Sequence, residues 1–111
     1  MPVIDKATFN ELKQMSGEDF INELIYAFLD DAPNMIQNMQ AALDTKDVES
    51  FRRNAHSLKS NANTFGAMEL GVLAKELEFM AKENNLDIGN KLEILKEAFG
   101  QVAEELKGMR A

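Results

Sequence analysis

Apolar residues recur at helical spacing along nearly the whole chain. They return every three or four positions, and no stretch alternates apolar and polar residues for long. This pattern predicts helices and no sheet. The predicted helices cover residues 8–15, 18–31, 34–43, 48–64 and 67–83, with a last one ending near residue 107.

A few residues mark where these helices begin and end. Gly17 breaks the first pattern, and Pro33 predicts a kink or a new start, because the residue before a proline avoids the helical region. Asp47 and Asp87 are expected N-caps, and Gly66 is an expected helix terminator. Short polar loops favour antiparallel neighbours. We therefore expect an all-α fold, an antiparallel four-helix bundle with a short N-terminal lead-in helix, as one domain over residues 1–111.

Two of the predicted helices carry more apolar surface than one core stripe needs. The arc over residues 18–31 spans about 200°, against about 100° for an ordinary stripe. We expect Phe9 and Leu12 of the lead-in helix to cover part of this arc, and extra core packing or an exposed docking patch to account for the rest. The helix over residues 67–83 has a second, minor stripe, made of Met68, Val72 and Phe79. We expect this stripe to pack against the lead-in helix or a neighbour.

Composition narrows the class of protein. The chain has 111 residues, a formal net charge of −7 and no cysteine. An acidic chain disfavours nucleic acid and anionic membranes as partners, and the lack of cysteine suits a reducing cytoplasm. No apolar run is long enough to span a membrane, and the first ten residues lack the features of a signal peptide. We expect a cytoplasmic domain.

The single histidine, His56, is predicted to face solvent. The core stripe of its helix consists of Val48, Phe51, Ala55, Leu58, Ala62 and Phe65. At 100° per residue, His56 lies about 130° from the centre of that stripe. Its neighbours three, four or seven positions away are Arg52, Arg53, Lys59, Ser60 and Asn63.

These surroundings suit phosphoryl chemistry. A neutral imidazole is a competent nucleophile near pH 7, and nearby cations such as Lys59 would stabilise phosphoryl oxygens. The small side chains of Ser60 and Asn63 leave space for a second protein. The simpler alternative is that His56 is an ordinary surface residue and that the arginines are solvated or paired with acids such as Glu49.

Other kinds of chemistry find little support in the sequence. One histidine without cysteine leaves only carboxylates to complete a zinc site, and there is no HExxH spacing. There is no glycine-rich phosphate loop, so we expect no ATP binding. Ser57 is adjacent to His56, and adjacent residues on a helix do not face each other, which disfavours a serine–histidine pair.

The stretch "AHSLKSNANTFGA" followed by "LAKELE" resembles the histidine-containing phosphotransfer (HPt) domains of two-component phosphorelays. The matching positions are His56, Leu58, Lys59, Ser60, Phe65, Gly66 and Ala67, then Leu73, Leu77 and Glu78. The upstream stretch "DFINELIYAFLDDAPNMIQNMQAAL" also resembles the first long helices of that family. The similarity thus covers nearly the whole chain.

The resemblance implies a role in signal transduction. His56 would accept a phosphoryl group from an aspartyl phosphate on a response-regulator receiver domain and pass it to another receiver, with Lys59 stabilising the phosphoryl group. The magnesium ion would sit on the receiver, so this chain would need no cofactor and no metal and would have no kinase activity. Expected partners are receiver domains or a hybrid sensor histidine kinase, and the domain itself is expected to be a monomer. The surface that a partner approaches is expected to include Arg52, Arg53, Ser60, Asn63 and Gly66.

One position departs from the family pattern. Ser60 stands where these domains usually have glycine directly after the lysine. We expect activity to survive, with a possible change of partner. Two alternatives stay open: an acidic helical adaptor that is not phosphorylated, and a domain like that of chemotaxis kinases, which an ATP-binding domain phosphorylates.

Overall fold

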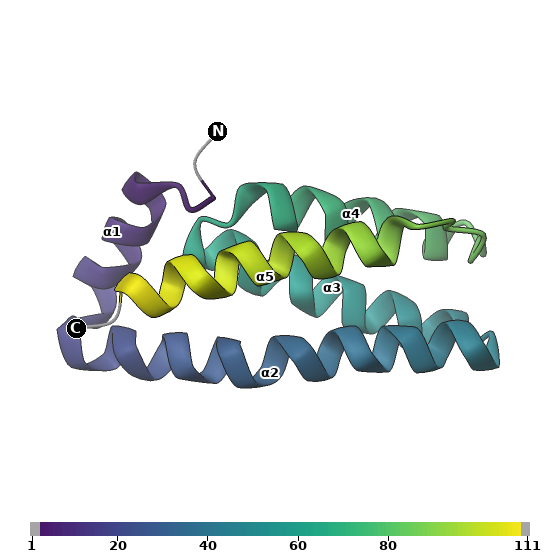
Figure 1. Cartoon of the computed structure of the whole chain (residues 1–111), viewed down its shortest axis with the longest axis horizontal. Coiled ribbons are helices and arrows are strands. Elements are labelled where there is room, and N and C mark those ends of the chain that lie inside the picture. The colour runs from purple at the N-terminus through teal and green to yellow at the C-terminus, as the bar shows by residue number, and fades with distance from the viewer. Residues whose placement is uncertain (1–2, 110–111) are drawn as a thin grey trace.

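The computed structural model describes residues 3–109, and these form five α-helices with no strand. The helices are α1 (Lys6–Ser16), α2 (Glu18–Thr45), α3 (Val48–Phe65), α4 (Met68–Lys82) and α5 (Lys91–Met109). Helices α2 to α5 run alongside one another as an elongated bundle, and α1 lies across one end (Figure 1). The predicted all-α four-helix bundle with a short lead-in helix is confirmed.

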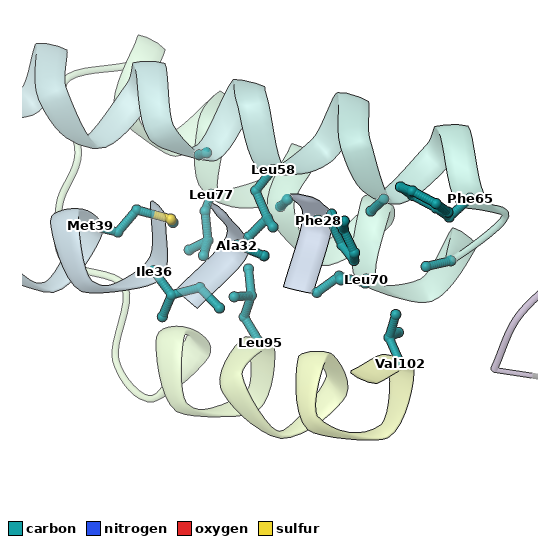
Figure 2. Packing of buried hydrophobic residues seen from close by; sticks show 14 of the residues in the cluster. Phe28, Ala32, Ile36, Met39, Leu58, Phe65, Leu70, Leu77, Leu95 and Val102 are labelled. Atoms are coloured by element: carbon teal, nitrogen blue, oxygen red, sulfur yellow. The ribbon is translucent and has the colours of Figure 1, made fainter. Parts of the chain in front are cut away.

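The core lies along the axis of the bundle, where all four long helices contribute side chains (Figure 2). The labelled residues are Phe28, Ala32, Ile36 and Met39 from α2, Leu58 and Phe65 from α3, Leu70 and Leu77 from α4, and Leu95 and Val102 from α5. Helices α3 and α4 make the most extensive contact of any pair. Small buried residues on both, such as Ala55, Ala62 and Ala74, allow this close approach.

Helix α2 continues through Pro33, so of the expected kink or new start at this proline the new start is wrong. The helix is unbroken over 28 residues. Pro33 is exposed, and the buried side chains of Ala32 and Ile36 hold the helix on the core on either side of it. Tertiary packing on both sides thus outweighs the one backbone hydrogen bond that a proline removes.

The two expected N-caps have different outcomes. Asp47 caps α3, because its Oδ1 accepts a hydrogen bond of 3.1 Å from the backbone N–H of Ser50. Asp87 does not cap α5, which begins at Lys91. The buried side chain of Ile88 and a turn at Gly89, whose φ is +60°, delay the helix start by one turn. Local capping preference is overridden there by burial of an apolar residue.

The lead-in helix covers part of the apolar arc of α2, as expected. Helix α1 packs on α2 and α3, Phe9 is buried and Leu12 is partly buried in the core. Phe20 of the arc remains 50% exposed. The second stripe of α4 is also exposed, so its expected packing against a neighbouring helix is wrong. The exposed fractions of its three residues are 37% for Met68, 63% for Val72 and 61% for Phe79.

Candidate functional site

His56 projects from α3 into solvent at the edge of the α3–α4 pair. Its neighbours Ala55 and Leu58 are completely buried, which fixes the opposite side of the helix in the core. The histidine side chain is 55% exposed. The predicted orientation of the imidazole is therefore confirmed, and the ring is open to a second protein.

Glu78 of α4 is the centre of the site. Its Oε2 lies 2.7 Å from Nδ1 of His56, and its Oε1 accepts a hydrogen bond of 2.7 Å from Nζ of Lys59. Only 4% of the Glu78 side chain is exposed. One buried carboxylate thus holds both the imidazole and the ammonium of α3. The sequence analysis matches Glu78 to the family pattern but does not predict it as a site residue, because its contact with His56 depends on how α4 packs against α3.

The partners of Glu78 keep its carboxyl ionised. Burial by itself would raise the pKa of Glu78, but the hydrogen bonds from Lys59 and from His56 hold that pKa below its ordinary value. Lys82, one turn further along α4, forms a longer ion pair with Glu78, with its Nζ 3.8 Å from Oε2. The carboxylate is an acceptor only, so the His56–Glu78 hydrogen bond has the imidazole as donor.

This hydrogen bond favours one tautomer of the neutral imidazole, the one with the proton on Nδ1. When Nδ1 carries the proton that it donates to Glu78, the lone pair is on Nε2. Nε2 is the ring nitrogen farther from the backbone. In the neutral ring, the geometry therefore anchors Nδ1 and leaves the lone pair on the outer nitrogen, as a nucleophile requires.

The other predicted site residues of α3 have different surroundings. Arg52 is paired with Glu49 one turn earlier and lowers the pKa of that carboxyl. Arg53, Ser60 and Asn63 are exposed on the same helix as His56. The Asn63 side chain leans across Gly71 of α4, and its Oδ1 lies in the space that a Cβ on Gly71 would need.

Gly66 does not belong to the surface that a partner approaches, so that expectation is wrong. It is buried beneath the N-terminal segment, and its carbonyl accepts a hydrogen bond of 2.8 Å from the backbone N–H of Asp5. Its φ of +87° ends α3 in the left-handed conformation, as predicted. Gly66 therefore has a structural role.

Among residues 3–109, no group of three or more His, Cys, Asp or Glu side chains is arranged to hold a metal ion. None of the helices in this range is long and apolar enough to cross a membrane.

Known proteins are similar to this chain in sequence and in fold. The model of the Hpt domain family matches residues 23–110. Histidine-containing phosphotransfer protein 2 of Arabidopsis thaliana is 28% identical over 85 residues, which cover 71% of this chain and 54% of that protein. The sensory/regulatory protein RpfC of Xanthomonas campestris pv. campestris is 30% identical over 80 residues, 71% of this chain but 11% of RpfC. The chain thus spans about half of the first relative and a small part of the second.

A solved structure extends the similarity to the whole fold. The crystal structure of histidine-containing phosphotransfer protein B (HptB) from Pseudomonas aeruginosa PAO1 superposes with a TM-score of 0.89 and 27% identity, covering 98% of this chain and 95% of HptB. Together with the family match over most of the chain, this similarity establishes what kind of domain the bundle is. The chain belongs to the Hpt domain family.

Proposed function

We propose that Nε2 of His56 is the atom that carries the phosphoryl group. The observation that supports this most directly is the hydrogen bond of 2.7 Å between His56 Nδ1 and the buried carboxylate of Glu78. It orients the ring with Nε2 outward and with its lone pair free. The donor is the aspartyl phosphate of a receiver domain, and the acceptor is the aspartate of another receiver.

The transfer balances without any group from a cofactor on this chain. The Nε2 lone pair forms a bond to phosphorus while the bond from phosphorus to the aspartyl oxygen breaks, and the aspartate leaves as a carboxylate. The imidazole becomes a cationic ring that keeps its proton on Nδ1. Glu78 accepts the hydrogen bond from that proton, so its negative charge stabilises the ring charge that develops during transfer.

The same arrangement supports the return step. The phosphorylated ring keeps its proton on Nδ1, so it leaves as a neutral imidazole, a good leaving group, when the bond from Nε2 to phosphorus breaks and the second receiver's aspartate takes the phosphoryl group. The magnesium ion that neutralises the phosphoryl oxygens belongs to the receiver.

We also propose the cytoplasm as the compartment, because a chain without cysteine suits a reducing environment.

Lys59 supplies positive charge beside the phosphoryl group. Its ammonium and the His56 ring bind the two oxygens of one carboxylate, so both lie at the same edge of the α3–α4 pair. With 23% of its side chain exposed, Lys59 is held more firmly than an ordinary surface lysine. We expect its ammonium to interact with phosphoryl oxygens bonded to Nε2 while it still neutralises Glu78.

A transfer experiment tests the phosphoacceptor. Receiver domains are phosphorylated with a radiolabelled small phosphodonor, purified and mixed with the wild-type chain, with His56→Gln and with Ser57→Ala as the matched exposed control. We expect acid-labile, alkali-stable label on the wild type and on Ser57→Ala and none on His56→Gln. Label that persists on His56→Gln would overturn the assignment, and a receiver that binds without any transfer would favour an unphosphorylated adaptor.

A further inference from the structure

A second surface of the bundle is apolar and uncovered. Met68, Val72 and Phe79 are spaced four and seven residues apart on α4, so they project on one side of the helix. They are at least 37% exposed, and Ile94 on the neighbouring helix α5 is 44% exposed. These four side chains have no role in the core or in the His56 site.

A groove between α4 and α5 borders this stripe. It has a volume of about 210 Å³ and is lined by Glu69, Leu73, Ile94, Glu97, Ala98 and Gln101. Val72 lies one helical turn from Glu69, which places the stripe along the edge of the groove. We refer to these six lining residues together with Met68, Val72 and Phe79 as the α4–α5 face.

The charges that line the groove all have the same sign. Glu69 and Glu97 are exposed and form no ion pair with any residue in the range 3–109. The nearby Glu76 is already neutralised by Lys91 of α5, whose Nζ lies 2.6 Å from its Oε1. The lining therefore offers apolar contact and two uncompensated carboxylates and contains no cation. The exposed Lys75 lies beside the stripe instead, one helical turn from Val72 and from Phe79.

We propose that the α4–α5 face binds a cationic amphipathic helix of a second protein. A helix lies naturally in a groove between two helices, with apolar residues one turn apart seated on Val72, Leu73 and Ile94. Lysine or arginine on its flanks meets Glu69 and Glu97, which adds affinity and speeds association.

The charges of the groove lining disfavour the two simplest other occupants. In a twofold contact between copies of this chain, each groove would meet the same groove, and the lining has no cation to set against Glu69 and Glu97. An anionic membrane would be repelled by the same carboxylates and by the net charge of −7. The lining therefore favours a different, basic polypeptide as the occupant.

This face is separate from the phosphotransfer site. Gly71 and Glu78 are on the side of α4 that contacts α3, whereas Glu69 and Leu73 are on the side that lines the α5 groove. A helix bound to the α4–α5 face leaves the His56 imidazole accessible. The domain can thus hold one partner through this face while a receiver exchanges its phosphoryl group with His56.

A titration followed by NMR tests the proposal. The ¹⁵N-labelled chain is titrated with an amphipathic Leu–Lys peptide of about 18 residues, and with a Leu–Glu peptide of the same length. We expect the Leu–Lys peptide to shift the amides of Val72, Leu73, Ile94 and Gln101 and to leave those of His56 and Ser60 unchanged. The Leu–Glu peptide should not bind.

Charge-reversal variants distinguish a site from general attraction to an acidic protein. Glu69→Lys combined with Glu97→Lys should weaken binding by about tenfold. The matched control, Glu11→Lys combined with Glu23→Lys, changes the net charge equally at exposed positions on α1 and α2 and should change affinity by less than about twofold at 0.15 M salt. Ile94→Ser should weaken binding by about fivefold because apolar contact is lost.

Four results would overturn the proposal. The first is absence of binding by the Leu–Lys peptide, and the second is equal binding by the Leu–Glu peptide. The third is a set of shifts that maps to α3, and the fourth is an equal loss of affinity in the control pair. His56→Gln should retain full binding, so the outcome is independent of the phosphoacceptor assignment.

Discussion

Nδ1 of His56 on α3 lies 2.7 Å from Oε2 of Glu78 on α4, and this glutamate is almost entirely buried. The pair joins the solvent-exposed imidazole to a carboxylate fixed by the packing of two helices. The same carboxylate binds Lys59 through its other oxygen. The reactivity that we propose for the exposed ring therefore depends on a residue that is itself almost entirely buried.

Replacing Glu78 with glutamine should slow transfer to His56 by about 10-fold to 100-fold. The amide is the same size but carries no charge, so the cationic ring that forms during transfer loses its stabilising partner. Single-turnover transfer from a phosphorylated receiver measures the rate, and ¹⁵N NMR of the imidazole reports which nitrogen is protonated. Glu76→Gln on the same helix is the control. An unchanged rate together with an unchanged tautomer would show that Glu78 is only structural.

Stability should depend on the ionisation of Glu78. Its pKa in the folded domain is below the ordinary value of 4.5, so it contributes stability above pH 4.5 that is lost as pH falls through the folded pKa. Urea unfolding of the wild type and of Glu78→Gln should differ at pH 7 by about 1–3 kcal/mol in the free energy of unfolding. The difference should narrow below pH 4.5, and a constant difference across that range would contradict this role.

Loss of the Lys59 ammonium should reduce transfer more than loss of the Lys82 ammonium. We expect Lys59→Met to slow transfer by about tenfold, because the charge-assisted hydrogen bond near the phosphoryl group is removed. Lys82→Met should cost less than about threefold, since an exposed ion pair contributes little. Lys82 is 57% exposed and 3.8 Å from Glu78, which makes it a matched control for Lys59. Equal effects of the two substitutions would show that only general positive charge matters.

The arginines beside His56 should affect how fast a receiver arrives. Reversing both Arg52 and Arg53 to glutamate should lower the association rate at low salt and change the dissociation rate little. Stopped-flow measurements at two salt concentrations separate the two rates. If association at low salt were as fast as in the wild type, electrostatic steering by these residues would be excluded.

Alanine at Gly66 should destabilise the fold without altering the chemistry. The backbone there has a φ of +87°, and a Cβ would lie 2.7 Å from the carbonyl oxygen of Asp5. We expect a loss of about 1–3 kcal/mol in the free energy of unfolding. Gly89→Ala, with a φ of +60° but nothing within 4 Å of the new Cβ, should lose less. Urea denaturation of both variants checks the order, and the reverse order would contradict the role of the Asp5 contact.

Features that depend on one helix could be predicted from the sequence. The orientation of His56 follows from the apolar period of α3, and the cap at Asp47 and the terminator at Gly66 follow from local backbone chemistry. Each of these depends on residues within a turn or two. The similarity to Hpt domains then supplied the function that the spacing alone left open.

Features that depend on how helices meet could not be predicted in the same way. Glu78 reaches His56 only because of the register between α3 and α4, which the sequence pattern does not encode. Pro33 and Asp87 follow local rules that packing overrides in the folded chain. The exposed stripe of α4 was expected to be covered, since apolar residues are more often buried than used for binding.

NMR of the phosphorylated domain tests the central claim most directly. The chain, labelled with ¹⁵N in the imidazole ring, is phosphorylated by a phosphorylated receiver, and long-range correlations identify the modified nitrogen. We predict phosphorus on Nε2 of His56 and a proton on Nδ1 both before and after transfer. A phosphoryl group on Nδ1, or on any other residue, would contradict the roles of His56 and Glu78 derived from their geometry.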